Sequence, residues 1–148
     1  MLAVLQRVSD ASVSVDGQVV GRIGRGLLVY LGVAAGDQSA DIDYIVSKIR
    51  DLRVFSDGEG KMNLSVGDVG GSVLLVSQFT LCGDVRNGRR PSFVGAEKPA
   101  LARERYDAAL AALRSTGLPV EAGVFQADMK VASVNDGPVT FIVDSAHR

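Results

Sequence analysis

Short runs of hydrophobic residues, separated by turn-forming residues, make up the first third of the chain. Runs rich in Val, Ile and Leu are divided by Asp16-Gly17 and by nearby glycines, and they predict strands at residues 2–8, 12–15, 18–23 and 27–33. The Asp-Gly step is typical of a two-residue hairpin turn. We therefore expect the chain to begin with strands joined by hairpins.

Two later segments have the spacing of apolar residues that is typical of an amphipathic helix. The first covers residues 39–52, with Ser39 as its candidate cap, and the second covers residues 99–116, with Pro99 in its first turn and Gly117 after its end. The apolar faces consist of Ile42, Ile45, Val46, Ile49 and Leu52 in the first helix, and of Ala102, Tyr106, Ala109, Leu110 and Leu113 in the second.

The other apolar runs predict further strands around a turn-rich segment. These strands are expected at residues 53–55, 72–81, 120–122, 128–134 and 139–143, the last two joined through Asn135-Asp136-Gly137-Pro138. No segment is typical of a linker or a repeat. We therefore expect residues 1–148 to form a single α/β domain, in which a strand-rich, mixed or antiparallel, barrel-like sheet packs with two helices.

Composition excludes several classes of protein. The chain has 148 residues, of which 47% are hydrophobic and 22% charged, and its net charge is -1, as in ordinary folded proteins rather than disordered ones. The longest apolar runs, such as residues 27–31 and 73–76, are far shorter than the ~20 residues that cross a bilayer. Residues 1–10 lack the apolar core of a signal peptide. We expect a cytoplasmic protein that does not contact membranes.

The rarest residues limit the chemistry. Cys82 is the only cysteine and His147 the only histidine, so the chain cannot form an internal disulfide or supply the roughly four ligands of a structural zinc site. We expect no metal and no cofactor. Because His147 is the penultimate residue, a Ser-His-Asp or Cys-His arrangement is nearly excluded. Catalysis would have to use hydroxyls, carboxylates, backbone dipoles or the substrate itself.

Four segments are candidates for a functional role, and each also has a purely structural interpretation. The glycines of residues 21–26 join two predicted strands, so they favour a hairpin over a phosphate-binding loop, which needs a following helix. Residues 86–90 place three arginines around a turn, either as a solvated loop or as a contact for nucleic-acid phosphates. Residues 77–81 put polar side chains where a strand meets a loop, although Thr80 is also a common strand residue. Residues 135–138 are typical of a hairpin corner.

In their order along the chain, these segments resemble the D-aminoacyl-tRNA deacylase family. The resemblance covers nearly the whole chain, and its specificity comes from several short motifs in register rather than from any one of them. The motifs are residues 6–9, 11–13, 26–29, 60–64, 77–81, 89–93 and 135–140. The resemblance implies a homodimer that hydrolyses the ester between a D-amino acid, or glycine, and the terminal ribose of tRNA. Glycyl-tRNA mischarged on tRNA-Ala is an expected substrate.

The resemblance also implies how the two enantiomers are told apart. Gly137-Pro138 would be a cis dipeptide that one subunit inserts into the pocket of the other, and Arg7 would secure it. Backbone carbonyls would hold the α-ammonium so that an L side chain strikes the protein while a D side chain points to solvent. Glycine, which has no side chain, would be accepted.

Further roles follow from the same resemblance. A backbone N–H near Phe79 or Thr80 would stabilise the oxyanion, and the neighbouring ribose hydroxyl would help to activate water. The full set is Ser77, Gln78, Phe79 and Thr80 for catalysis, Phe125, Met129 and Asn135 for the substrate and its terminal adenine, and Arg86, Arg89 and Arg90 for the tRNA backbone. Gln126 departs from the family pattern, which has a small residue there, and Cys82 stands where Tyr or Ala is expected.

Alternative functions remain open at this point. One is a nucleic-acid-binding module without catalysis, which would use the arginine-rich loop. Another is a general esterase that acts through Thr80 or Cys82, although Thr80 has no evident base in the sequence.

Overall fold

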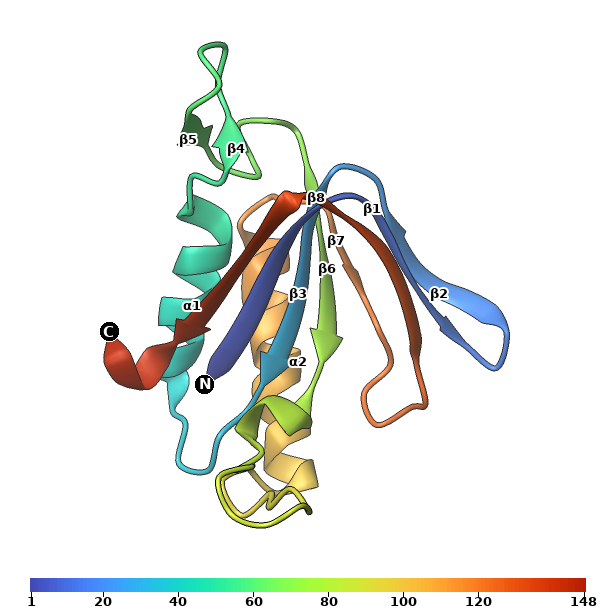
Figure 1. The fold of residues 1–148 in the computed structure, drawn as a ribbon, viewed down its shortest axis with the longest axis vertical. Helices are drawn as coiled ribbons and strands as arrows, with labels where there is room; N and C mark the ends of the chain where they lie inside the picture. Colours follow the sequence, from blue (N-terminus) through green and yellow to red (C-terminus); the bar gives the residue numbers. More distant parts are fainter.

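A six-stranded mixed sheet and two α-helices form most of the molecule, which is described here by a computed structural model of all 148 residues (Figure 1). The strands are β1 (Leu2–Val15), β2 (Gln18–Ile23), β3 (Gly26–Gly32), β4 (Phe55–Ser56), β5 (Met62–Leu64), β6 (Ser72–Ser77), β7 (Val120–Ala122) and β8 (Lys130–Asp144). The helices are α1 (Ser39–Asp51) and α2 (Pro99–Ser115), with 3-10 helices η1 (Phe79–Cys82) and η2 (Ser145–His147).

The sheet has the order β2-β1-β3-β6-β7, and β8 pairs with β1. The β3–β6 and β6–β7 pairs are parallel, whereas β1 is antiparallel to each of its neighbours. The sheet curls so far that β2 comes close to β7. A Cβ atom added to Gly21 in β2 would lie 2.8 Å from the carbonyl oxygen of Ala122 in β7. The predicted class, a barrel-like mixed sheet with two helices, is confirmed.

The hairpin at the start of the chain forms as predicted. Asp16 and Gly17 have φ values of 49° and 77°, the left-handed conformation that a type I′ turn requires at both central residues. The prediction of separate strands at residues 2–8 and 12–15 is wrong, since β1 runs through residues 9–11. Its register against β8 shifts after Val8, so the break in hydrophobic alternation marks a bulge rather than the end of a strand.

The largest difference from the predicted fold lies in β8. Residues 135–138 do not form a hairpin corner, because β8 is one continuous strand that pairs with β1 on both sides of them. Gln6 pairs with Thr140 and Val8 pairs with Asn135, so the extra residues form a bulge opposite Arg7. Figure 1 shows β8 bending with β1 at the end of the sheet away from η1. Bulges and turns use the same residue types, so composition could not separate them.

The strand predicted over residues 72–81 ends earlier, at Ser77. The Gln78 N–H still donates to the Leu31 carbonyl at 2.8 Å, which extends the hydrogen-bonding pattern between β6 and β3 by one residue. The chain then turns into η1, so Thr80 lies in a 3-10 helix and not in a strand. The strand ends here because its partner β3 ends at Gly32.

The predicted helical faces pack onto the sheet. Ile42, Ile45, Val46 and Ile49 of α1 are buried, as are Ala102, Tyr106, Ala109 and Leu113 of α2. The cap of α1 is Gln38 rather than Ser39, since the Gln38 N–H donates to the Asp41 carboxylate at 2.8 Å. This hydrogen bond lowers the pKa of Asp41.

A second apolar cluster fills the inside of the curled sheet and contains Val8, Ala11, Val13, Ile23, Leu28, Leu74 and Val76.

Tyr106 joins α2 to the centre of the sheet. Its hydroxyl donates to the Leu75 carbonyl at 2.9 Å, and burial raises the pKa of Tyr106 to about 12. We expect Tyr106→Phe to lower the free energy of unfolding at pH 7 by about 1 kcal/mol through the lost hydrogen bond.

The same contact predicts a pH dependence. An unfolded chain ionises tyrosine near pH 10. Between about pH 10 and the folded pKa of about 12, the unfolded state therefore binds fewer protons, and wild-type stability falls as pH rises. Denaturant titrations at pH 7 and pH 11 should show that the difference in free energy of unfolding between the wild type and Tyr106→Phe is smaller at pH 11. Tyr44→Phe is the control. An equal deficit at both pH values would contradict this assignment.

Candidate functional site

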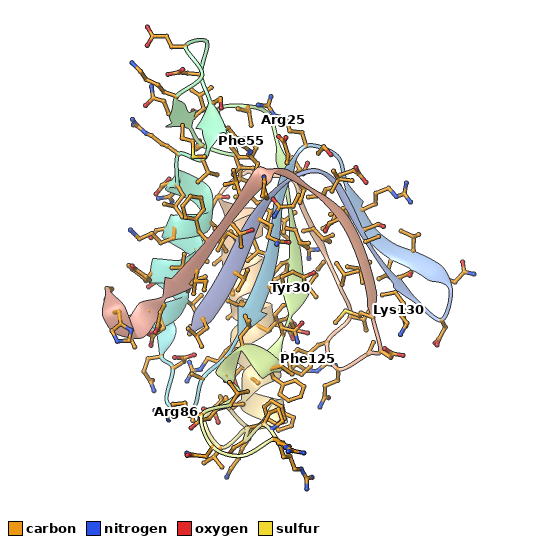
Figure 2. All side chains as sticks on the ribbon, viewed as in Figure 1. Arg25, Tyr30, Phe55, Arg86, Phe125 and Lys130 are labelled. Atoms are coloured by element: carbon orange, nitrogen blue, oxygen red, sulfur yellow. The ribbon has the colours of Figure 1, made fainter.

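A cavity of about 710 Å³ opens where β6 ends and η1 begins. Its walls are the residues around η1, the N-terminal end of α2, and the segment between β7 and β8. Ser77, Gln78, Phe79, Phe125 and Met129 all line it, so five predicted site residues from distant parts of the sequence come together here. Figure 2 shows Phe125 beside η1 and above the arginine-rich loop.

The turn from β6 into η1 presents backbone donors beside this cavity. The first 3-10 hydrogen bond runs from the Leu81 N–H to the Gln78 carbonyl at 3.3 Å. The N–H groups of Phe79 and Thr80 precede that bond and have no partner within the turn. They can therefore donate to an anionic oxygen.

The Thr80 hydroxyl has one side-chain partner, the carboxamide of Gln78, whose Nε2 donates to it. No carboxylate, histidine or lysine hydrogen-bonds to this hydroxyl, so the structure provides no base to activate it as a nucleophile. Thr80 is also absent from the cavity wall.

Gly32, at the end of β3, determines how closely η1 approaches the sheet. A Cβ atom at this position would lie 2.9 Å from the Gln78 carbonyl oxygen and 3.3 Å from the Cys82 Sγ atom. The first contact is with backbone and cannot be relieved by a side-chain rotation. Sequence analysis did not identify this role, because the contact joins segments that lie far apart in the chain.

Phe125 is held by two residues of α2. The Arg103 guanidinium lies over its ring at 5.0 Å from the ring centroid, and the Tyr106 ring is 5.8 Å away. Sequence analysis did not single out Arg103 as a contact of this ring. On the η1 side of the cavity, the rings of Phe79 and Phe93 meet edge to face at 5.0 Å. Both arrangements present aromatic surface to the cavity, which suits stacking with a base.

The bulge in β8 is a separate cluster. The Gly137-Pro138 peptide bond is cis, which is the geometry that the family resemblance implies. Arg7, whose side chain is 12% exposed, donates from Nε to the Asp136 carbonyl at 3.0 Å and from Nη1 to the Val54 carbonyl at 2.7 Å. The Arg7 Nε also lies 3.5 Å from the Asp136 carboxylate. Arg7 is therefore a nearly buried residue that holds backbone carbonyls.

Asn135 spans the same bulge. Its carboxamide donates to the Thr140 hydroxyl at 2.9 Å and accepts from the Val139 N–H at 3.0 Å. Within one chain, Asn135 lies in this cluster and not in the cavity that Phe125 and Met129 line.

One chain does not bring the bulge and the cavity together. Arg7 pairs with Leu27 near the start of β3, and β6 begins beside that point. Ser77 is at the other end of β6, where it pairs with Leu31. Gly137-Pro138 and residues 77–80 therefore lie at opposite ends of the sheet.

The arginine-rich loop is closed by a bridge between Asp84 and Ser92, with hydrogen bonds of 2.7 and 2.9 Å. Arg86 is paired with Asp84 at 2.7 Å, and its hydrogen bonds lower the pKa of Asp84 to about 2. Arg89 and Arg90 make no ion pair in the structure. Of the three arginines predicted to contact phosphates, Arg86 is therefore held in an exposed ion pair, and the other two have none.

The structure gives little support to a thiol nucleophile or to a metal site. Burial raises the pKa of the Cys82 thiol, so it is protonated at neutral pH and a poor nucleophile. Nowhere do three or more His, Cys, Asp or Glu side chains gather in positions that could hold a metal ion. None of the helices has the length and apolar character needed to span a membrane.

Fold and site define an α/β protein with an aromatic-lined cavity next to backbone hydrogen-bond donors. The chain belongs to the D-Tyr-tRNA(Tyr) deacylase family, whose sequence profile matches residues 4–144. The family resemblance found from the sequence motifs is confirmed.

Individual relatives match over almost their full length. The chain is 61% identical to a D-aminoacyl-tRNA deacylase of Desulfitobacterium hafniense (strain DSM 10664 / DCB-2), over 98% of this chain and 97% of that protein. It is 57% identical to a D-aminoacyl-tRNA deacylase of Chloroflexus aurantiacus (strain ATCC 29364 / DSM 637 / Y-400-fl), over 99% of this chain and 91% of that protein.

Two solved structures are also similar. One is titled c-Myc DNA unwinding element binding protein, with a TM-score of 0.92 and 42% identity over 97% of this chain and 98% of that one. The other is a probable eukaryotic D-amino acid tRNA deacylase, with a TM-score of 0.81 over 96% of this chain and 97% of that one. At 19% identity, the second likeness supports the fold alone.

Proposed function

We propose that this protein hydrolyses the ester bond of D-aminoacyl-tRNA. The observation that carries the proposal is the 61% identity, across 98% of the chain, to a relative named D-aminoacyl-tRNA deacylase. The cavity supports it, because it gathers Ser77, Gln78 and Phe79 with Phe125 and Met129. The protein would act in the cytoplasm, on tRNA that has been charged with the wrong enantiomer.

The chemistry requires no side-chain base. Water attacks the ester carbonyl, and the N–H groups of Phe79 and Thr80 stabilise the oxyanion that forms. The bond to the ribose oxygen then breaks, which releases the D-amino acid and leaves a free hydroxyl on the tRNA. The neighbouring ribose hydroxyl relays the proton between the water and the leaving oxygen, so the substrate supplies the group that the protein lacks.

Selection against L-amino acids would require a second copy of the chain. Gly137-Pro138 of one subunit would enter the cavity of the other, and its carbonyls would hold the α-ammonium. The free edge of β8 supports this arrangement, because β8 pairs with β1 alone and exposes apolar side chains at Val134, Phe141 and Ile142. Glycine would pass the same test, so glycyl-tRNA mischarged on tRNA-Ala is a further proposed substrate.

The rest of the cavity would bind the 3′ end of the tRNA. Phe125 and Met129 would contact the terminal adenine, Asn135 would join the substrate contacts through the partner's bulge, and Arg89 and Arg90 would neutralise phosphates.

The proposal is tested by incubating the purified protein with tRNA carrying D-tyrosine, L-tyrosine or glycine. Hydrolysis of the D-tyrosyl and glycyl esters, with the L-tyrosyl ester intact, is the expected result. Binding of tRNA without hydrolysis would instead favour a nucleic-acid-binding module. This is the second candidate, because the solved structure at 42% identity is named a DNA unwinding element binding protein. Equal hydrolysis of a substrate ending in 2′-deoxyadenosine would favour a general esterase.

Thr80→Val should retain at least a third of the deacylation rate. The proposed oxyanion donors are backbone N–H groups, which this substitution leaves in place, and the hydroxyl has no base. Cys82→Ala should behave in the same way, because the thiol is protonated. Single-turnover hydrolysis measures both rates. An acylated Thr80 trapped by acid quench, or complete loss of activity in Cys82→Ala, would contradict the proposed scheme.

The double substitution Arg89→Gln and Arg90→Gln should weaken tRNA binding by roughly tenfold and reduce its salt dependence. Each phosphate contact that is lost lowers the slope of log K against log salt by about 1. Arg86→Gln is the matched control and should change the slope less, because Asp84 already neutralises Arg86. Equal slopes in the wild type and the double variant would mean that the tRNA is held elsewhere.

A further inference from the structure

Phe55 lies in the core directly beside the carbonyl that holds Arg7. Its side chain is 1% exposed, and the Arg25 guanidinium lies 5.4 Å from its ring centroid, at the end of the sheet away from η1 (Figure 2). The Val54 carbonyl, which accepts from Arg7 Nη1 at 2.7 Å, belongs to the peptide unit that joins Val54 to Phe55. Because a peptide unit is planar and rigid, the acceptor of Arg7 and the backbone of Phe55 move together.

The β4–β5 hairpin holds this peptide unit from the other side. Phe55 in β4 pairs with Leu64 in β5, and both side chains pack in the main apolar core. The Asp57 carboxylate closes the turn, since it accepts from two backbone N–H groups at 2.8 and 3.0 Å. Residues 60–64 are a motif of the family resemblance to which the proposed function gives no role. They form part of the turn and the second strand of this support.

The two carbonyls that Arg7 holds differ in how firmly they are fixed. Val54 is 3% exposed, whereas the side chain of Asp136 in the bulge is 58% exposed. The hydrogen bond to the Val54 carbonyl, at 2.7 Å, is also shorter than the 3.0 Å bond to the Asp136 carbonyl. A close-packed core resists displacement. The core side therefore determines where the Arg7 guanidinium lies, and the guanidinium determines where the bulge lies.

We propose that Phe55 is a positioning residue for the selection of enantiomers, and that it acts through the Val54 carbonyl and Arg7. A smaller side chain would let the peptide unit shift into the space that the ring leaves, and Arg7 would follow its acceptor. A shift of about 1 Å in a positioning group is enough to change rates. This inference rests on the proposed function and names a residue outside both the cavity and the bulge.

The test is a double-substitution cycle on the ratio of single-turnover rates for D- and L-tyrosyl-tRNA. Phe55→Leu should lower that ratio about fivefold in the wild-type background. In the Arg7→Lys background, which lacks the guanidinium, the same substitution should change the ratio by less than about 1.5-fold. Phe55→Met, whose flexible side chain fills more of the space, should show the same coupling with a loss of about twofold. It completes the cycle if Phe55→Leu does not fold.

Leu113→Val separates this role from a general loss of packing. Leu113 is buried to the same degree as Phe55 and lies near the end of α2 away from the cavity. Both Phe55→Leu and Leu113→Val should lower Tm by about 3–6 °C, but Leu113→Val should leave the D to L ratio unchanged. An unchanged ratio in Phe55→Leu, an equal fall in Leu113→Val, or equal effects of Phe55→Leu in the two backgrounds would overturn the inference. A wild-type protein that hydrolyses neither ester, or both equally, would overturn the proposed function instead.

Discussion

Gly32→Ala should lower the single-turnover deacylation rate by about 10²-fold. The added methyl group would lie 2.9 Å from the Gln78 carbonyl oxygen and 3.0 Å from the Leu81 Cβ atom, so η1 must move away from β3. That movement shifts the N–H groups of Phe79 and Thr80, which are the proposed oxyanion donors. Loss of one such donor costs about 10²- to 10³-fold in other hydrolases.

The control for this variant is Gly24→Ala. Gly24 lies in the turn between β2 and β3, and a Cβ atom there would have no neighbour within 4 Å. Its rate and Tm should match those of the wild type. Gly32→Ala should also lose about 1–3 kcal/mol of stability through overpacking, so rates are compared at temperatures where both proteins are folded. A folded Gly32→Ala with a wild-type rate would mean that the position of η1 does not control the chemistry.

Local signals predicted the helices well. The faces of α1 and α2 follow a period that lies within one segment, and Pro99 with Gly117 marked the ends of α2 to within one or two residues. β8 shows the limit of such signals. Its central residues 135–138 have the composition of a turn, but pairing with β1 decides that they form a bulge. That pairing joins the two ends of the chain, so no local pattern contains it.

For the candidate site, too, the residues could be predicted from the sequence but the contacts that position them could not. Residue types singled out residues 77–81, and the family resemblance added Phe125 and Met129. The structure places Ser77, Gln78 and Phe79 around one cavity with these two residues. The contacts that position them were not predictable, because each joins segments far apart in the sequence. Gly32 against Gln78 and Arg103 over Phe125 are examples. Sequence therefore indicated which residues to examine, and the fold showed what holds them.

Arg7→Lys should reduce hydrolysis of D-tyrosyl-tRNA by roughly tenfold to 10²-fold and lower the ratio of D to L rates. The Arg7 guanidinium donates to two carbonyls on different elements, those of Asp136 in the bulge and Val54 before β4. A lysine ammonium is a single point on a flexible stem and cannot hold both in one fixed geometry. If the bulge positions the α-ammonium of the substrate, a displacement of about 1 Å is enough to produce this loss.

Arg22→Lys provides the matched control. Arg22 is an exposed residue of β2 with no hydrogen bond or ion pair from its side chain, so the same substitution there should leave both rates unchanged. Deacylation of D- and L-tyrosyl-tRNA by the two variants separates a selective role for Arg7 from a general effect of replacing arginine. Because the Arg7 side chain is only 12% exposed, Tm is recorded alongside the rates. A folded Arg7→Lys protein with wild-type rates on both enantiomers would show that Arg7 acts only to join β1, β8 and the residues before β4.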